Sequence, residues 1–243
     1  GGIGGAVGYT LAADSGPIVA ASPITGGSGT SARADGSIAS VAAAVSPAVV
    51  NIDTGTGSGT GFVIRSDGYI LTNNHVVGDG SALRVTFEDG TTADAQLIGA
   101  NPGYDLAVIK VDATNLPTLP WGDSGKLRVA EWVLAIGNPF QLSGTVTLGI
   151  VSTVSRSQSG AFTDFIQTDA AINPGNSGGA LIDANGNLLG INTAIFSRSG
   201  GNNGIGFAIP VSIARQVMEG LVRDGSVTRG WIGVESRDLT AEI

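Results

Sequence analysis

The sequence predicts an all-β protein with two β subdomains, and three observations lead to this prediction. Glycine is unusually frequent, at 39 of 243 residues, while aromatic residues make up only 5%. Short apolar runs alternate with Gly, Asn and Asp turns along most of the chain, which is typical of β-sandwiches and β-barrels. The pattern pauses from Leu116 to Gly122, where prolines stand at 117 and 120. We therefore place the boundary between a first subdomain, 37–118, and a second, 119–228, in this stretch.

The first 36 residues are predicted to form a flexible Gly/Ser-rich segment. The stretch GGIGGAVGYTLAA is apolar and uncharged, but a bilayer span needs about 20 apolar residues. It is either the end of a membrane anchor or signal segment, or an ordinary Gly-rich tail. Order is expected from Ser37, where Ile38, Val41 and Val45 have the spacing of a short helix that Pro47 ends.

Strand signals follow this helix. Two apolar runs flank Ser66-Asp67-Gly68 in GTGFVIRSDGYILTNNHVV and predict a β-hairpin. Further strands are predicted in ALRVTFE, TADAQLIGA, DLAVIKVDA, EWVLAIG, TVTLGIVSTVSR, DFIQTDAAI, GALIDANGNLLGINTAI and GIGFAIP. One long helix is expected after Pro210, because residues 213, 217, 221 and 214, 218, 222 form an apolar stripe that ends before Gly225.

Charge and composition exclude several functions. The 12 basic and 20 acidic residues give a net charge of -8 without a basic cluster, which argues against nucleic-acid binding. Cysteine is absent, so disulfides and thiol chemistry are excluded. His75 is the only histidine, so a histidine-based metal cage is excluded and we expect neither a metal nor another cofactor. Any imidazole chemistry must use His75.

The segment Gly175-Asn176-Ser177-Gly178-Gly179 contains a candidate nucleophile. A serine hydroxyl needs a base that takes its proton and donors that hold the resulting oxyanion. Flanking glycines allow the backbone to aim several N–H groups at one point, so the amides of Gly175 and Ser177 are candidate donors. Taken alone, however, such a segment is more often a plain turn.

His75 makes catalysis the stronger interpretation. It ends an apolar strand in the first subdomain, and Ser177 lies at a strand end in the second, so a site at their seam would join them. A core histidine is the ordinary alternative. Asp105 is the preferred orienting carboxylate, because it follows His75 and opens the strand DLAVIKV. The other candidates are Asp53, Asp67, Asp89, Asp112 and Asp169, of which Asp67 and Asp89 precede glycine in predicted turns.

Several motifs resemble one known family. GTGFVI, ILTNNHVV, YDLAVIKV, GNPF, TLGIVS, FIQTDAAINPGNSGGALID, LLGINTAI and GIGFAIP are similar to the HtrA (DegP/DegQ/DegS-type) serine proteases, from Ser37 to Val234. The resemblance implies a chymotrypsin-like double β-barrel. It makes His75 the general base, Asp105 its orienting partner and Ser177 the nucleophile, with an oxyanion hole at Gly175, Asn176 and Ser177. Asp169 and Asn173 would be structural members of the loop that leads to the serine.

The family also implies a function. This is ATP-independent serine endopeptidase activity on unfolded or damaged envelope proteins, in the periplasm or at the cell envelope. The alternatives are a site-specific protease in a stress-signalling cascade and a chaperone or peptide-binding module that uses the same cleft. Activity should rise over about pH 6–8 as the imidazole loses its proton.

Substrate and regulatory residues follow from the same resemblance. The predicted substrate pocket lacks acidic residues, which favours cleavage after small or medium aliphatic residues; Ile172 and Ile195 could equally be core. Its residues are Ala171, Ile172, Thr193, Ala194, Ile195 and Phe196. Loops 137–144, 155–164 and 196–204 are candidate activation loops, and Arg156 is either a regulatory contact or a solvated arginine.

Two departures from the family stand out. RGWIGVES resembles the start of a PDZ domain, but residues 229–243 are too few to complete one. A homotrimer is implied by the family, although the N-terminal aromatic residues that usually support it are missing between Tyr9 and Phe62.

Overall fold

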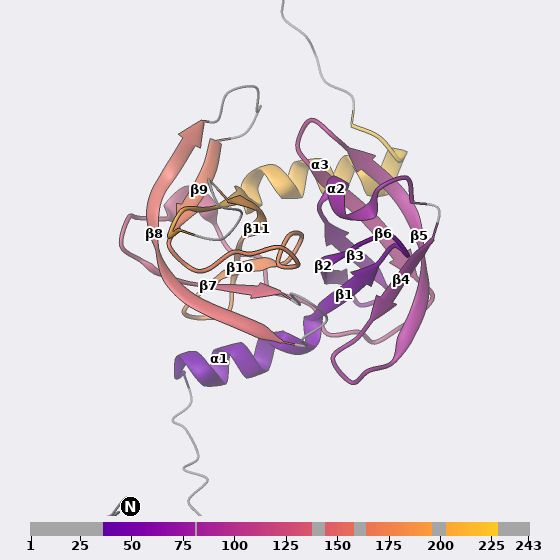
Figure 1. Ribbon diagram of the computed structural model, residues 1–243, viewed down its shortest axis with the longest axis horizontal. Coiled ribbons are helices and arrows are strands. Elements are labelled where there is room, and N and C mark those ends of the chain that lie inside the picture. The colour runs from indigo at the N-terminus through magenta and orange to yellow at the C-terminus, as the bar shows by residue number, and fades with distance from the viewer. Residues whose placement is uncertain (1–35, 81, 138–143, 158–163, 196–202, 228–243) are drawn as a thin grey trace, which may run out of the picture. The chain divides into compact units, whose positions relative to one another are not determined.

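The structure is a computed structural model that describes residues 36–80, 82–137, 144–157, 164–195 and 203–227. Within these residues, twelve strands form two closed antiparallel barrels of six strands each (Figure 1). The first barrel consists of β1 (Val49–Asp53), β2 (Ser58–Arg65), β3 (Tyr69–Thr72), β4 (Leu83–Thr86), β5 (Thr92–Asn101) and β6 (Leu106–Val111). The second consists of β7 (Trp132–Gly137), β8 (Thr145–Ser157), β9 (Asp164–Thr168), β10 (Ala180–Asp183), β11 (Leu188–Ile195) and β12 (Gly206–Pro210).

Both barrels have the same connectivity, which confirms the predicted double β-barrel. The strand order is β1-β2-β3-β6-β5-β4 in the first barrel and β10-β11-β12-β9-β8-β7 in the second. The first barrel closes where β4 pairs with β1, and the second closes where β7 pairs with β10. The predicted boundary at 118/119 falls in the connection between β6 and β7.

Because side chains alternate in direction along each strand, the buried apolar residues fall into three cores. In β6, Ala107, Ile109 and Val111 fill the first barrel, whereas Leu106 and Val108 face a core shared with the second barrel. Strand β7 likewise sends residues 133 and 135 into its own barrel and residues 134 and 136 into the shared core. Each fully buried Leu or Ile contributes about 1.5–3 kcal/mol, so the shared core fixes how the barrels meet.

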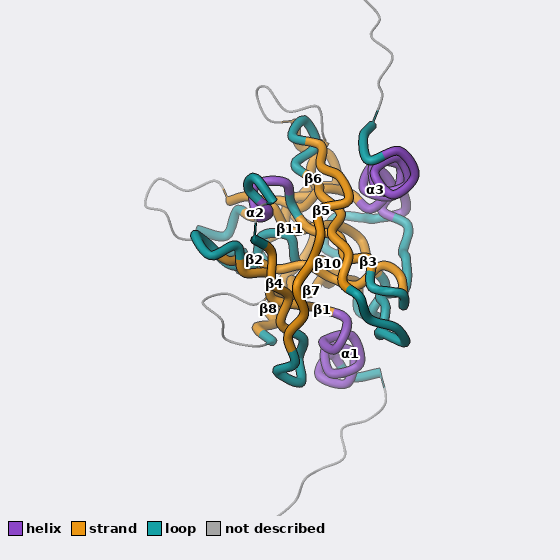
Figure 2. The backbone as a smooth tube through the Cα atoms, turned by 90° about the vertical axis from the view of Figure 1, so that its right-hand side faces the viewer, coloured by secondary structure: helices purple, strands orange, loops and turns teal. Residues whose placement is uncertain are grey.

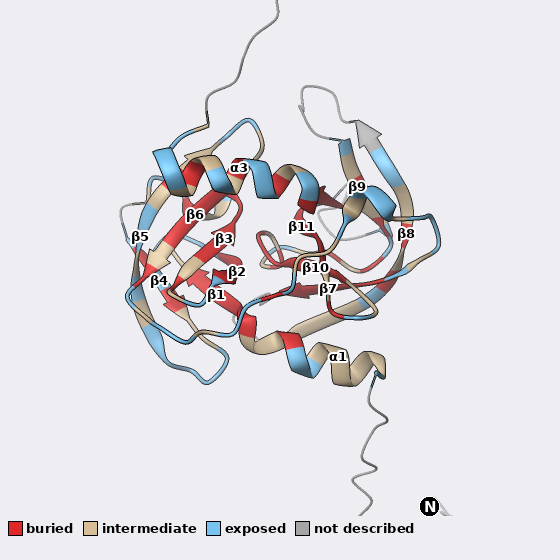
Figure 3. Ribbon diagram, turned by 180° about the vertical axis from the view of Figure 1, so that it is seen from behind, coloured by how far each residue is buried: buried red, intermediate tan, exposed pale blue. Residues whose placement is uncertain are grey.

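Two helices flank the strands, and both match the sequence prediction. Helix α1 (Ile38–Val45) begins at Ser37, whose side chain accepts a hydrogen bond from the Ser40 amide at 3.2 Å. Helix α3 (Val211–Asp224) contacts β5 and β6 of the first barrel and β11 and β12 of the second. In Figure 2, α3 lies near the upper end of the strands and α1 near their lower end. The buried residues of α3, red in Figure 3, belong to the shared core. Among the described residues, no helix has both the length and the apolar character needed to cross a bilayer.

Three local features differ from the prediction. Strand β1 was not expected, because its five residues directly follow the helical segment and the short 3₁₀ helix η1 (Ser46–Ala48). His75 lies in a short helix, α2 (Asn74–Val77), rather than at the end of a strand. Strand β9 ends at Thr168 instead of continuing to Ile172, because the Thr168 hydroxyl accepts the Ala170 amide at 3.1 Å and turns the chain away from the sheet.

Candidate active site

Asp105 is held by its backbone at the point where β6 begins. Its amide donates to the Pro102 carbonyl at 3.2 Å, and its φ of 53° lies in the left-handed region that Asp tolerates better than most residues. The Asn73 side-chain amide donates to the Asp105 carbonyl at 2.7 Å. The carboxylate is therefore presented by a fixed turn of the first barrel.

This carboxylate binds His75 at two places. The imidazole Nδ1 lies 2.8 Å from Asp105 Oδ2 and 3.0 Å from Oδ1, and the His75 backbone amide donates to Oδ1 at 3.0 Å. Because an ionised carboxylate can only accept, Nδ1 carries a proton, and Nε2 is the ring nitrogen left to face a nucleophile or substrate. The His75 side chain is 50% exposed, so its outer edge is accessible.

Thr193 of β11 supplies a third donor to Asp105 from the second barrel. Its hydroxyl donates to Asp105 Oδ2 at 2.6 Å. Burial by itself raises the pKa of Asp105, but the hydrogen bonds from His75 and Thr193, with the charge of His75, outweigh it and leave the pKa below its ordinary value. Asp105 is thus ionised at neutral pH, as the orienting role requires.

Ser177 lies in the connection between β9 and β10, and Thr193 also contacts it. The Ser177 hydroxyl donates to the Thr193 carbonyl at 3.3 Å. Within the described part of the chain, no hydrogen bond joins this hydroxyl to His75. Hydrogen bonds of this kind are often long in the absence of substrate and tighten when it binds. The hydrogen bond of the Ser177 hydroxyl to Thr193 O must therefore break before its proton can pass to the base.

The backbone around Ser177 is fixed by a set of hydrogen bonds. The Asn176 amide donates to Asn173 O and the Gly179 amide donates to Asn176 O, both at 2.9 Å. The Gly178 amide donates to Asn192 O at 2.8 Å. The amides of Gly175 and Ser177 have no acceptor among the described residues and remain candidate oxyanion donors.

Gly178 explains why the segment tolerates no side chain directly after the serine. Its φ of 82° is left-handed, and a Cβ at this position would collide with the Thr60 carbonyl and the Thr72 hydroxyl of the first barrel. The glycine lets the nucleophile turn approach the first barrel closely. The small residues of the segment therefore serve inter-barrel packing as well as backbone conformation.

The structure assigns other partners to most of the rival aspartates. Asp89 accepts the Thr91 amide and hydroxyl, and Asp67 pairs with Arg65, as expected of turn residues. Asp53 accepts the Gly55 amide at 2.7 Å. Asp169 accepts the Ile150 amide at 2.7 Å, which ties the loop before the serine to β8. Among the aspartates considered, Asp105 is the one that contacts His75 in the described structure.

The predicted pocket residues are described only in part. The Ala171 carbonyl accepts the Thr147 hydroxyl at 2.9 Å and the Asn176 amide group at 3.3 Å. Ile172 is 2% exposed and packs in the second barrel's core, which matches the alternative interpretation of this residue. The Thr193 hydroxyl donates a hydrogen bond to the Asp105 carboxylate. The side chains of Ala194, Ile195, Phe196 and Arg156, most of the activation loops and residues 228–243 lie outside the described residues.

Sequence reasoning missed two positions near the site. Asn73 is fully buried and holds the Asp105 carbonyl, and Thr60 is fully buried and contacts the turn that carries Ser177. Thr60 lies between two glycines in β2, and Asn73 directly follows β3. Their burial makes a hydrogen-bond partner necessary, but no neighbouring apolar residue in the sequence signals that burial.

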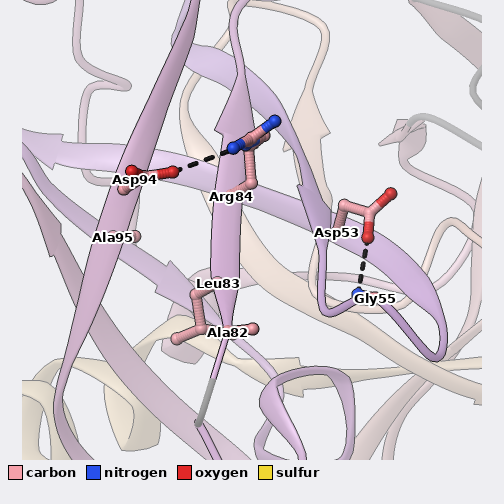
Figure 4. A pocket seen from close by; sticks show the side chains of 7 residues that line it. All are labelled: Asp53, Gly55, Ala82, Leu83, Arg84, Asp94 and Ala95. Carbon is pink, nitrogen blue, oxygen red and sulfur yellow. Dashed lines mark hydrogen bonds and ion pairs between the residues drawn. The ribbon is translucent and has the colours of Figure 1, made fainter.

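A separate hollow of about 520 Å³ opens at the edge of the first barrel (Figure 4). Its charged groups already have partners, because Arg84 Nε lies 3.4 Å from Asp94 Oδ1 and Asp53 accepts the Gly55 amide. None of its lining residues belongs to the catalytic set. We therefore place the site at the barrel seam, on side-chain geometry.

Comparisons with known proteins agree with this geometry. A family described as a trypsin-like peptidase domain matches residues 59–191, more than half of the chain, and this range includes all three candidate catalytic residues. The chain therefore belongs to the trypsin-like peptidase family and, within it, to the HtrA/DegP-like serine proteases.

The similar proteins are longer than this chain. A probable periplasmic serine endoprotease, DegP-like, from Brucella suis biovar 1 is 56% identical over 188 residues, which cover 76% of this chain and 37% of the relative. Its namesake from Chlamydia trachomatis serovar D is 51% identical over 187 residues, or 76% of this chain and 38% of the relative. The chain thus spans little more than a third of these relatives.

Solved structures show the same fold. The HtrA-type protease AlgW with a tripeptide superposes with a TM-score of 0.81 at 51% identity, covering 85% of this chain and 70% of AlgW. The serine endoprotease from Yersinia pestis gives a TM-score of 0.71 at 43% identity, covering 82% and 71% of the two chains.

Proposed function

We propose that this chain is a serine endopeptidase in which Ser177 attacks the peptide bond. The observation that carries the proposal is the position of Thr193 between the two halves of the site. Its carbonyl holds the Ser177 hydroxyl at 3.3 Å, and its hydroxyl holds the carboxylate that orients His75 at 2.6 Å. One residue thus brings the nucleophile to the base and its partner.

The mechanism follows from this arrangement. The Ser177 hydroxyl gives up its hydrogen bond to Thr193 O, and His75 Nε2 takes its proton as Oγ attacks the substrate carbonyl. The amides of Gly175 and Ser177 stabilise the oxyanion, while Asp105 keeps the imidazole tautomer and stabilises its cation. His75 then protonates the leaving amine, and water repeats the sequence on the acyl-enzyme.

The proposed substrates are unfolded or damaged proteins outside the cytoplasm. The relatives' names, which call them periplasmic endoproteases, support the location. We further propose cleavage after small or medium aliphatic residues, because the predicted pocket contains no acidic side chain. A panel of peptides that differ only before the scissile bond tests this, and a preference for Lys or Arg would contradict it.

The proposed assembly is a homotrimer, which rests on family membership alone. Light scattering of the protein in solution measures it directly. We expect about three times the chain mass of 24.1 kDa, and a mass of one chain would contradict the assembly.

Degradation of a reduced, unfolded model protein tests the activity. Wild type should cleave it, and Ser177→Ala should not. Ser124→Ala is a matched control, because this half-buried serine hydrogen-bonds to Ser212 and lies outside the candidate site. Equal cleavage by wild type and Ser177→Ala would refute the nucleophile. Binding of the unfolded protein without cleavage by wild type would favour the chaperone alternative.

A further inference from the structure

Thr60 is a fully buried residue of the first barrel whose hydrogen bonds reach into the second. It lies on β2, where it is paired with Asn51 of β1. Its amide donates to the Ser177 carbonyl at 2.9 Å, and its hydroxyl donates to the Gly175 carbonyl at 2.6 Å. A single residue of one barrel therefore holds two carbonyls of the nucleophile turn in the other.

Through its hydrogen bonds to these two carbonyls, Thr60 restrains two peptide planes. The Gly175 carbonyl shares its plane with the Asn176 amide, which donates to Asn173 O at 2.9 Å. The Ser177 carbonyl shares its plane with the Gly178 amide, which donates to Asn192 O at 2.8 Å. Because peptide groups are planar, each of these units is held at both ends.

The candidate oxyanion donors lie in the peptide units that alternate with the two fixed ones. The Ser177 amide belongs to the unit whose carbonyl, Asn176 O, accepts the Gly179 amide at 2.9 Å. The Gly175 amide belongs to the unit from Pro174, and its direction depends on the backbone angles of Gly175, whose φ is 101°. A glycine in this region can rotate readily, so the hydroxyl of Thr60 on its carbonyl restricts that rotation.

We propose that Thr60 is a positioning residue for the oxyanion hole. Its hydroxyl fixes the Gly175 carbonyl and so keeps the Gly175 amide directed at the developing oxyanion. The inference rests on the proposed protease function and deepens it. Thr60 touches neither substrate nor base, so its effect passes entirely through the geometry of the turn.

Removal of the hydroxyl should therefore act on the transition state. Thr60→Val keeps the shape of the side chain and the backbone bond to Ser177 but removes the donor to Gly175. Losing an oxyanion donor costs about 10²–10³ in rate. Thr60 only orients the Gly175 amide and is not itself an oxyanion donor. We therefore expect a smaller loss, with kcat falling about 10- to 100-fold and KM changing less than about threefold.

The experiment compares Thr60→Val with Thr60→Ser, which restores the hydroxyl, on a fluorogenic peptide that wild type cleaves. Ser46→Ala is the control: Ser46 is half-buried, and its hydroxyl also donates to a backbone carbonyl, that of Ala42 in α1, at 2.8 Å, without contacting the nucleophile turn. Rates are normalised to the sites titrated by an active-site reagent. If Thr60→Val does not fold, Thr60→Ala replaces it.

A second readout separates positioning from general damage. A peptide boronic acid forms a tetrahedral adduct with the serine, so its inhibition constant should weaken in Thr60→Val by the same factor as kcat. The pH dependence of kcat/KM should keep its midpoint, because His75 and Asp105 are unchanged. Thr60→Ser and Ser46→Ala should stay within about threefold of wild type in kcat.

Several results would overturn the proposal. These are an unchanged kcat in Thr60→Val, an equal loss in Thr60→Ser or Ser46→Ala, a shifted pH midpoint, and unchanged boronic acid affinity in a slowed Thr60→Val. Failure of the protease function itself is a different result, because wild type would then show no cleavage that depends on Ser177.

Discussion

The two barrels contribute unequal halves of the site. The first barrel presents His75 and Asp105 on short connections, and their hydrogen bonds of 2.8–3.0 Å are already in place. The second presents Ser177 on the connection between β9 and β10, with its hydroxyl on Thr193 O. The proposed general-base half thus has its hydrogen bonds in place, whereas the hydroxyl of the proposed nucleophile donates to Thr193 O and not to His75.

Each barrel also contributes a threonine that hydrogen-bonds to the half of the site carried by the other barrel. Thr193 of the second barrel donates to Asp105 of the first, and Thr60 of the first donates to the Gly175 carbonyl of the second. The shared core, with Leu106 and Val108 facing Leu134 and Ile136, holds the barrels in the position that these bonds need. The site therefore depends on the seam as much as on either barrel.

Removal of the base should have the largest effect. We expect His75→Ala to lower kcat by about 10⁶-fold, because the whole proton transfer is lost. The side chain is half exposed, so thermal unfolding should remain close to that of wild type. Initial rates at high enzyme concentration measure the loss, and a loss below about 100-fold would show that another group acts as base.

Neutralising the orienting carboxylate should have the next largest effect. We expect Asp105→Asn to lower kcat by about 10⁴-fold, because an amide in place of the carboxylate favours the wrong imidazole tautomer. Asp94→Asn is the control, since Asp94 is 86% exposed and pairs only with Arg84 among the described contacts. Similar rates for the two variants would contradict the role of Asp105.

Replacement of Thr193, which contacts both halves of the site, should lower the rate less than these two substitutions. We expect Thr193→Val to lower kcat/KM about tenfold, which corresponds to one lost hydrogen bond to a charged group. Because this donor lowers the pKa of Asp105, its loss should raise that pKa. Thr193→Ser should recover most of the activity. A loss of the same size in the Ser variant would mean that packing, and not the hydroxyl, carries the effect.

The smallest expected effect is on acid stability. The folded state lowers the pKa of Asp105, so the carboxylate adds stability above its unfolded pKa of about 3.9, and this is lost as the pH falls through the folded pKa. Urea unfolding of wild type and Asp105→Asn between pH 6 and pH 2 measures the difference. We expect it to shrink toward low pH, and a constant difference would contradict the assignment.

Much of the fold and three catalytic candidates could be predicted from local patterns. The alternating runs gave most strands, and short motifs singled out Ser177 and His75, while the family resemblance selected Asp105. The contacts of the two threonines could not be predicted, because Thr60 meets Gly175 across 115 residues and Thr193 meets Asp105 across 88. Such contacts depend on how the barrels pack, which no local pattern contains. Helix α2 was missed for a related reason, since four residues are too few for a helical period.

We propose that His75 activates Ser177 as a nucleophile across the barrel seam. The most direct test of this proposal is covalent labelling of the intact protein by a fluorophosphonate, followed by peptide mapping. We expect a single adduct, on Ser177, whose formation is nearly abolished in His75→Ala. Labelling of a different residue, or an equal labelling rate in His75→Ala, would contradict it.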